Sequence, residues 1–127
     1  HLSIRRQRQM CIRDRSKDGV IIGEYKKGIV IDLDSAKAIV KERRAHYSGN
    51  RPYVVVDKGV KGITKEAMKY FSTPESFDGI TAVGMVQKGG FSRLMMKFLV
   101  MIASPPVRVK IFEDENKAVA WVKRFVE

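Results

Sequence analysis

The chain has 127 residues, a length typical of a single domain that buries a core of its own. Its 44% hydrophobic and 31% charged content is that of a soluble globular protein. The longest wholly apolar run, Phe98 to Ala103, is much shorter than the ~20 residues of a membrane span, so we expect no span and a cytoplasmic location. The only cysteine, Cys11, excludes an internal disulfide and a cysteine-rich metal site.

The net charge of +11 is unevenly distributed. Residues 1–16, HLSIRRQRQMCIRDRS, hold five arginines and one aspartate and follow neither a helical nor a strand period. This segment resembles a translated sequencing adapter, so we predict a non-native scar or a disordered arm, and a domain at 17–127 that lacks its first strand. A native basic arm that touches nucleic acid is the alternative. The remaining charges are scattered and have no interleaved aromatic residues, so nucleic acid is not an expected partner.

The elements alternate between strands and helices after an initial hairpin. The hairpin is predicted from two strands, Val20–Tyr25 and Ile29–Leu33, joined by a turn at Gly28. The first helix is expected from an Asp34 cap to about Tyr47, and its inward-facing residues are Ala36, Ile39, Val40 and Arg43. The later strands are predicted at 52–56, 80–86 and 107–112, the last as an edge strand, and the later helices at 64–72, 91–103 and from Asp114. This order predicts one α/β domain, a mixed and mainly parallel sheet covered by four helices.

The stretch from Pro52 to Phe71 is the first place to look for a site. Val54 to Val56 read as a strand buried on both faces, and Asp57 ends it. Thr64 stands where the cap of the next helix should be. The loop between them lies at the carboxyl end of the strand, where open α/β sheets place functional groups.

No catalytic constellation is present in the sequence. Asp57 has the position of a base or a metal ligand, but such an aspartate more often caps the loop that follows it. His46 lies among arginines on a surface helix, and no carboxylate or cysteine stands at metal-ligand spacing from it. Gly89 and Gly90 form a second glycine-bearing loop without the rest of a phosphate-binding fingerprint. We therefore expect no enzyme activity, no cofactor and no metal.

Four segments together resemble the STAS-like domains related to bacterial anti-sigma-factor antagonists. They are GIVIDLDSAKAIVKERR, RPYVVVDKGVKGITKEAMKYF, GITAVGMV and SPPVRVKIFEDENKAVAWV. The likeness is closer to a branch of small, uncharacterised bacterial proteins named for a STAS or CRAL-TRIO-like lipid-transfer fold. It implies a STAS-like fold and, by analogy, a non-enzymatic regulatory or protein-interaction role.

The resemblance also implies a candidate phosphoacceptor. Phosphoregulated STAS domains carry D-x-S-x-V-x-x-I-D-S-S-G after the central strand, with a phosphorylated serine at the helix start. Asp57 matches the first aspartate, but Lys65 occupies the phosphoacceptor position. Thr64, one residue earlier, is the only hydroxyl in the loop, and a phosphate there would lie at a helix N-terminus near Lys61 and Lys65. The alternative, which we favour, is that Thr64 is only a cap.

The expected helix at 91–103 is apolar around more than one face and carries flexible methionines such as Met96. It fits a core helix, a partner or homodimer surface, or a lid over a lipid-like ligand. Our leading hypothesis is a protein-interaction domain, and the alternative is a small apolar-ligand or lipid-binding domain. The expected binding residues of the loop and helix are Asp57, Lys58, Lys61, Thr64, Lys65, Gly89, Gly90 and Met96.

Overall fold

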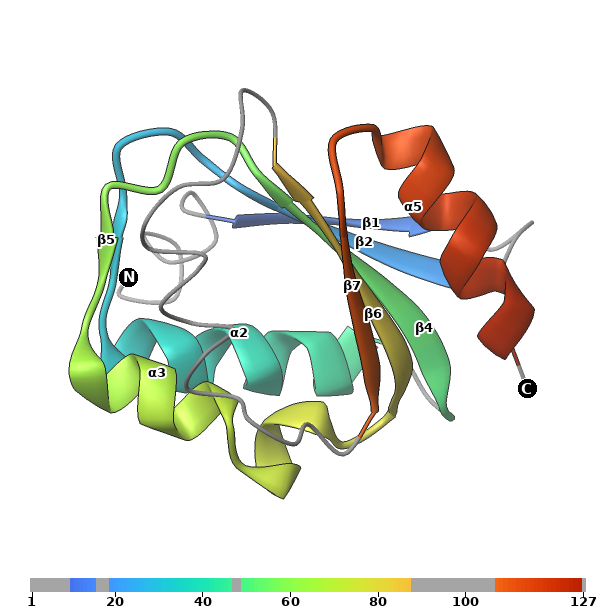
Figure 1. Cartoon of the computed structure of the whole chain (residues 1–127). Coiled ribbons are helices and arrows are strands. Elements are labelled where there is room, and N and C mark those ends of the chain that lie inside the picture. Colours follow the sequence, from blue (N-terminus) through green and yellow to red (C-terminus); the bar gives the residue numbers. More distant parts are fainter. Residues whose placement is uncertain (1–9, 16–18, 47–48, 88–106, 127) are drawn as a thin grey trace.

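The protein is described by a computed structural model covering residues 10–15, 19–46, 49–87 and 107–126. Its centre is a five-stranded sheet (Figure 1). The spatial order of the strands is β1 (Met10–Arg15), β2 (Val20–Tyr25), β4 (Arg51–Asp57), β6 (Ile80–Gln87) and β7 (Arg108–Phe112). β1 runs antiparallel to β2, and the other neighbouring pairs are parallel. The predicted mixed, mainly parallel sheet is confirmed.

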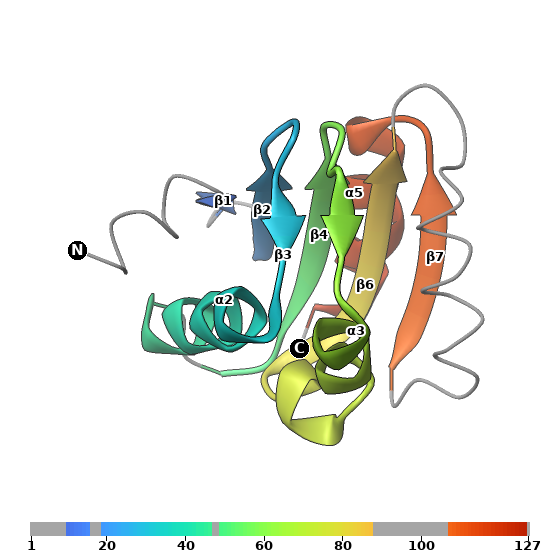
Figure 2. The ribbon, with the colours of Figure 1, turned by 90° about the vertical axis from the view of Figure 1, so that its left-hand side faces the viewer.

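Helices cover both faces of this sheet (Figures 1 and 2). One face packs against α2 (Leu33–His46) and α3 (Lys65–Phe71). The 3-10 helix η1 (Pro74–Phe77) follows α3 in the chain. The opposite face packs against α5 (Glu115–Val122), which continues into the 3-10 helix η2 (Lys123–Phe125). The described residues contain three α-helices rather than the four expected, because the predicted helix at 91–103 lies outside them.

Strand β4 is the centre of the fold, as its sequence predicts. Every residue from Pro52 to Asp57 is buried, because β4 has a strand on each side and helices above and below. Alternate side chains therefore feed two separate cores. Tyr53 and Val55 point toward α2, while Val54 and Val56 point toward α5.

The predicted hairpin is wrong. The chain does turn at Gly28, whose φ of +82° is in the left-handed region that glycine tolerates. The following strand β3 (Val30–Ile31) does not return along β2, however, since β1 and β4 occupy both edges of β2. It pairs instead in parallel with β5 (Gly62–Ile63), forming a second, two-stranded sheet.

The segment that we left out of the fold contributes a strand. Residues 10–15 form β1 and pair with β2 along its whole length, from Arg15 opposite Val20 to Met10 opposite Tyr25. The edge that we expected to lack its first strand is therefore covered. The foreign origin of residues 1–16 and the domain boundary at Lys17 stay predictions.

The helix boundaries agree with the sequence apart from one cap. The amide of Ser35 donates to Asp32 Oδ1 at 2.8 Å, so Asp32 caps α2, and Asp34 lies inside the first turn. The inward row of α2 is confirmed, since Ala36, Ile39, Val40 and Arg43 are all buried. Asp114 caps α5 as expected, and β7 is the end strand of the sheet.

Candidate functional site

Asp57 caps the loop after β4. It is buried, and its Oδ1 accepts hydrogen bonds from the amides of Gly59 and Val60, both at 2.8 Å. These bonds give Asp57 a structural role, the more common of the two interpretations considered from the sequence. They hold the loop in one shape at the carboxyl edge of the sheet.

Thr64 is the N-cap of α3, the role that we favoured. Its Oγ1 accepts a hydrogen bond from the amide of Ala67 at 3.1 Å, and its extended backbone is that of an N-cap residue. Lys65 follows it and is exposed. Phosphorylation of Thr64 stays a prediction.

Four exposed lysines gather where β2 and β4 end, and we call Lys26, Lys27, Lys58 and Lys61 the lysine edge. The turn that carries the first two lies beside the loop that carries the others (Figure 2). Backbone hydrogen bonds join the two segments: Gly28 donates to Gly59 at 2.8 Å, Lys58 to Tyr25 at 3.1 Å and Lys61 to Ile29 at 2.8 Å.

Only half of the lysine edge is predicted from the sequence. Lys58 and Lys61 were expected at the site, whereas Lys26 and Lys27 were assigned to a hairpin turn. The signal available in the sequence was the pair of short runs Val30–Ile31 and Gly62–Ile63, which form β3 and β5 and bring the two lysine-bearing turns together. Lys58 also reaches Glu24, with Nζ 3.3 Å from Oε2. Gly89, Gly90 and Met96 lie outside the described residues.

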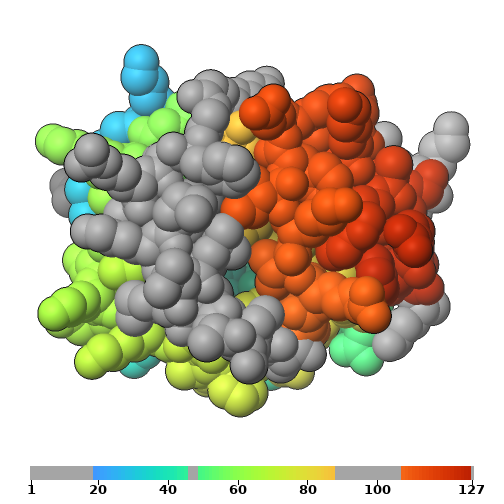
Figure 3. Space-filling view, viewed as in Figure 1, coloured from blue at the N-terminus to red at the C-terminus, as the bar shows by residue number. Residues whose placement is uncertain are grey.

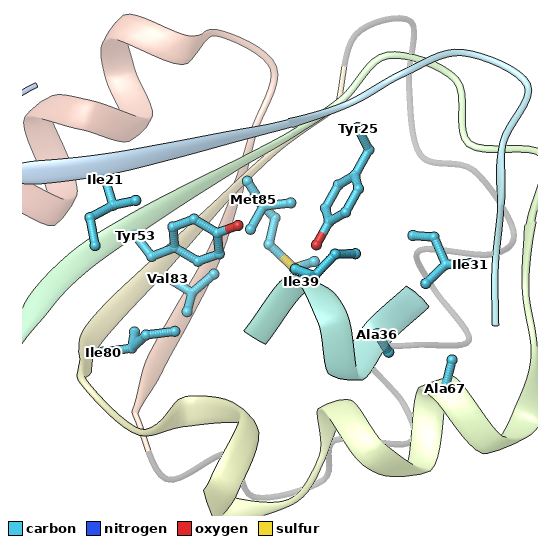
Figure 4. Close-up of a cluster of buried hydrophobic side chains, with 11 residues drawn as sticks. Ile21, Tyr25, Ile31, Ala36, Ile39, Tyr53, Ala67, Ile80, Val83 and Met85 are labelled. Carbon is cyan, nitrogen blue, oxygen red and sulfur yellow. The ribbon is translucent and has the colours of Figure 1, made fainter. Parts of the chain in front are cut away.

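A cavity of about 120 Å³ lies on the α2 side of the sheet. Its wall is mainly apolar and includes Ile39, Ile63, Phe77, Val83, Met85 and Val109. Several of these belong to the buried cluster drawn in Figure 4. Five polar residues also border it: Tyr25, Arg43, Tyr53, Asp57 and Ser76. An apolar pocket with a few converging polar groups is the usual form of a small-molecule site.

Arg43 is the most unusual of these polar residues, because only 5% of it is exposed. One of its terminal nitrogens, Nη2, donates to the carbonyl oxygens of Ser76 at 2.8 Å and Asp78 at 3.2 Å. Its guanidinium carbon lies 5.5 Å from the centre of the Tyr53 ring, which makes a cation–π contact. Burial lowers the pKa of Arg43, although the group stays charged near neutral pH.

Two tyrosine hydroxyls meet beside Arg43. The hydroxyls of Tyr25 and Tyr53 point toward one another in the cluster (Figure 4). Burial, followed by the influence of Tyr53, raises the pKa of Tyr25 well above its usual value. Helical spacing predicts that Arg43 faces inward. The two tyrosines were not predicted as site residues, because the sequence of a strand does not show which residue of the neighbouring strand will lie beside it.

The raised pKa of Tyr25 predicts a loss of stability in alkali. Below pH 10.0, the usual pKa of tyrosine, both the folded and the unfolded chain keep the proton on Tyr25. As the pH rises further, the unfolded chain releases this proton first, so the free energy of unfolding falls. Urea denaturation at a series of pH values above 9 should show a shallower fall for Tyr25→Phe than for the wild type. Equal slopes would contradict the assignment.

No three His, Cys, Asp or Glu side chains of the described part of the chain come together as metal ligands would. None of the helices described has the length and apolarity to cross a bilayer.

The fold is SpoIIAA-like, or STAS-like. A solved structure with a TM-score of 0.62 carries this fold: an uncharacterised protein of the DUF3478 family from Shewanella loihica PV-4. The two are 14% identical, and the match covers 89% of this chain and 93% of the other. The expected STAS-like fold is confirmed.

The family follows from the sequence itself. Residues 15–126 match the model of a domain of unknown function, DUF7793, and the chain belongs to that family. No functionally curated protein matches the chain.

Proposed function

We propose that this STAS-like domain is a non-enzymatic interaction module that binds an acidic surface of a partner protein through its lysine edge. The carrying observation is that two turns, joined by backbone hydrogen bonds, present four exposed lysines at one place. A rigid array of like charges attracts a complementary surface and loses little conformational freedom of the backbone on binding. Of the loop and helix expected from the sequence, the loop supplies Lys58 and Lys61 to this surface, whereas α3 lies at the other end of β5 (Figure 2).

The proposal assigns no catalysis to the edge. The one carboxylate considered as a base, Asp57, directly precedes Lys58, and its Oδ1 already accepts hydrogen bonds from two backbone amides. Lysines held at the surface serve as points of positive charge. We accordingly propose that the domain turns over no substrate.

Charge reversal tests the proposal. Proteins captured by the wild-type chain from nuclease-treated native lysate would be identified, and the affinity of the purified partner would then be measured. We expect Lys27→Glu/Lys58→Glu/Lys61→Glu to weaken that affinity by about tenfold or more. The difference in affinity between this variant and the wild type should be smaller at high salt. The matched control is Lys37→Glu/Lys41→Glu/Lys117→Glu, which reverses three exposed lysines of α2 and α5.

Three outcomes would refute the edge as a protein-binding surface. In the first, the wild type captures no protein that the edge variant fails to capture. In the second, both variants lose the same affinity, so only net charge matters. In the third, the captured material is nucleic acid or a second copy of the chain, which would favour one of the alternatives set out from the sequence.

A second candidate function is the binding of a small apolar ligand, and the cavity supports it. The cavity of about 120 Å³ has a mainly apolar wall. An engineered apolar cavity of about 150 Å³ accepts benzene, whereas drug-sized ligands occupy about 300–1,000 Å³. The cavity therefore suits a ligand of roughly ring size rather than a whole lipid.

A further inference from the structure

We propose that the cavity selects a small carboxylate: an apolar body of about one ring that carries a single negative charge. Arg43 would bind the carboxylate, and the paired hydroxyls of Tyr25 and Tyr53 would donate a hydrogen bond to it. This inference rests on the second candidate function, because it assumes that the cavity takes a ligand.

The first argument is the unbalanced charge of Arg43. A buried cation is strongly destabilising unless an anion or several hydrogen bonds compensate for it. Within the part of the chain that the structure describes, Arg43 forms no ion pair, and its two hydrogen bonds both leave from Nη2. Nε and Nη1 therefore keep donors for a bound group, and a guanidinium matches the geometry of a carboxylate.

The second argument is the place of Arg43 in the cavity. Arg43 lines it together with apolar side chains of the sheet, including Val83 and Met85. The ring of Tyr53 beneath the guanidinium fixes its position. A ligand with a negatively charged end and an apolar body would thus contact the guanidinium of Arg43 and the apolar side chains at the same time.

The tyrosines supply neutral donors beside the charge. Both are buried, and their hydroxyls converge in the same cluster (Figure 4). Tyrosine is protonated at neutral pH, and the two hydroxyls are hydrogen-bonded to each other, so one of their two hydrogens is engaged and an anion would take a hydrogen bond from the other.

Asp57 also borders the cavity and decides which end holds the anion. Its backbone lies four residues beyond that of Tyr53 on β4, about 13 Å at the usual rise of a strand, and opposite that of Tyr25, whose side chain extends toward Tyr53 (Figure 4). The ligand carboxylate therefore belongs at the Arg43 end, and the apolar body extends away from it along the sheet.

Isothermal titration calorimetry on the whole chain tests the proposal with two matched probes, benzoate and its neutral relative benzyl alcohol. We expect benzoate to bind the wild type at least tenfold more tightly. Arg43→Met should reduce the affinity for benzoate at least tenfold and leave that for benzyl alcohol within about threefold. Lys58→Glu/Lys61→Glu should leave both affinities unchanged, which separates the cavity from the lysine edge.

The remaining outcomes decide against one claim or both. Benzyl alcohol binding as tightly as benzoate would overturn the carboxylate proposal and leave the apolar-ligand function standing. If neither probe binds, both the carboxylate proposal and the apolar-ligand function are refuted. If Arg43→Met does not fold, as judged by circular dichroism, the comparison of the two probes on the wild type still decides. Tyr53→Phe keeps the charge of Arg43 and should lower the affinity for benzoate a few-fold. An unchanged affinity would contradict the proposed hydroxyl contact.

Discussion

Ile22→Ala is expected to lower the free energy of unfolding by about 3 to 4 kcal/mol, because large-to-small changes at filled core positions cost about 2–5 kcal/mol. Ile22 is completely buried and is among the largest side chains with no exposure. It lies in β2 on the α5 side, in the cluster that includes Val54 and Val119. Urea denaturation followed by circular dichroism would measure the loss.

Two control variants show whether the lost volume is the cause. Ile22→Val removes one methylene from the same place and should cost only about 1 kcal/mol. Val30→Ala changes a side chain that is 48% exposed, so it should have little effect. An Ile22→Ala loss no larger than that of Ile22→Val would mean that the α5 side is not packed as described.

Gly23→Ala is expected to destabilise the fold by about 1–3 kcal/mol, the usual cost of overpacking a core. A methyl group on Gly23 would point at the ring of Tyr53 and collide with its hydroxyl oxygen and with ring carbons at 3.0 and 3.1 Å. Tyr53 is 3% exposed and is held by the guanidinium of Arg43, so it has little room to move. The same denaturation measurement gives the size of the effect.

A double-mutant cycle isolates this contact. Tyr53→Phe alone should cost about 1 kcal/mol, the typical net value of a hydrogen bond, because it removes the hydroxyl that faces Tyr25. Combined with Gly23→Ala it removes the closest collision, so the double variant should be more stable than the sum of the single changes predicts. Simple additivity of the two changes would show that the tyrosine does not lie over Gly23.

Local sequence patterns predicted most elements of this fold because their physics is local. A β-branched run such as Val54 to Val56 is typical of a strand buried on both faces, and β4 is such a strand. Thr64 and Asp114 were recognised as caps, since capping needs only a hydroxyl or carboxylate a few residues before a helical pattern. Arg43 was placed inward by helical spacing alone.

Pairing between distant segments was not predictable in the same way. Val20–Tyr25 and the run after Gly28 have every local sign of a hairpin, and the turn between them exists. The competing partners, β1 and β4, decide the outcome because they occupy both edges of β2. The first was excluded on composition, so the sequence argument lacked the strand that displaces the hairpin.

The residues of the candidate site also divide into those predictable from one segment and those that depend on pairing between distant segments. Asp57, Lys58 and Lys61 were found because one loop carries them. The Arg43–Tyr53 contact joins a helix to a strand, and the hydroxyls of Tyr25 and Tyr53 meet across two strands. No spacing rule links such residues before the register of the strands is known.

The division of the core by the sheet gives each half its own optical signal. The single tryptophan, Trp121, lies on the α5 side, with its ring centre 5.8 Å from that of Phe112 and 5.0 Å from that of Phe125. Tyr25 and Tyr53 lie on the other side, at the cavity. Tryptophan fluorescence therefore reports the packing of α5 on the sheet, while tyrosine difference absorbance includes the α2 side, where Tyr70 packs against the same cluster as Tyr25 and Tyr53. A chain that unfolds as one unit would lose both signals at the same urea concentration, and a gap between them would show the two halves melting apart.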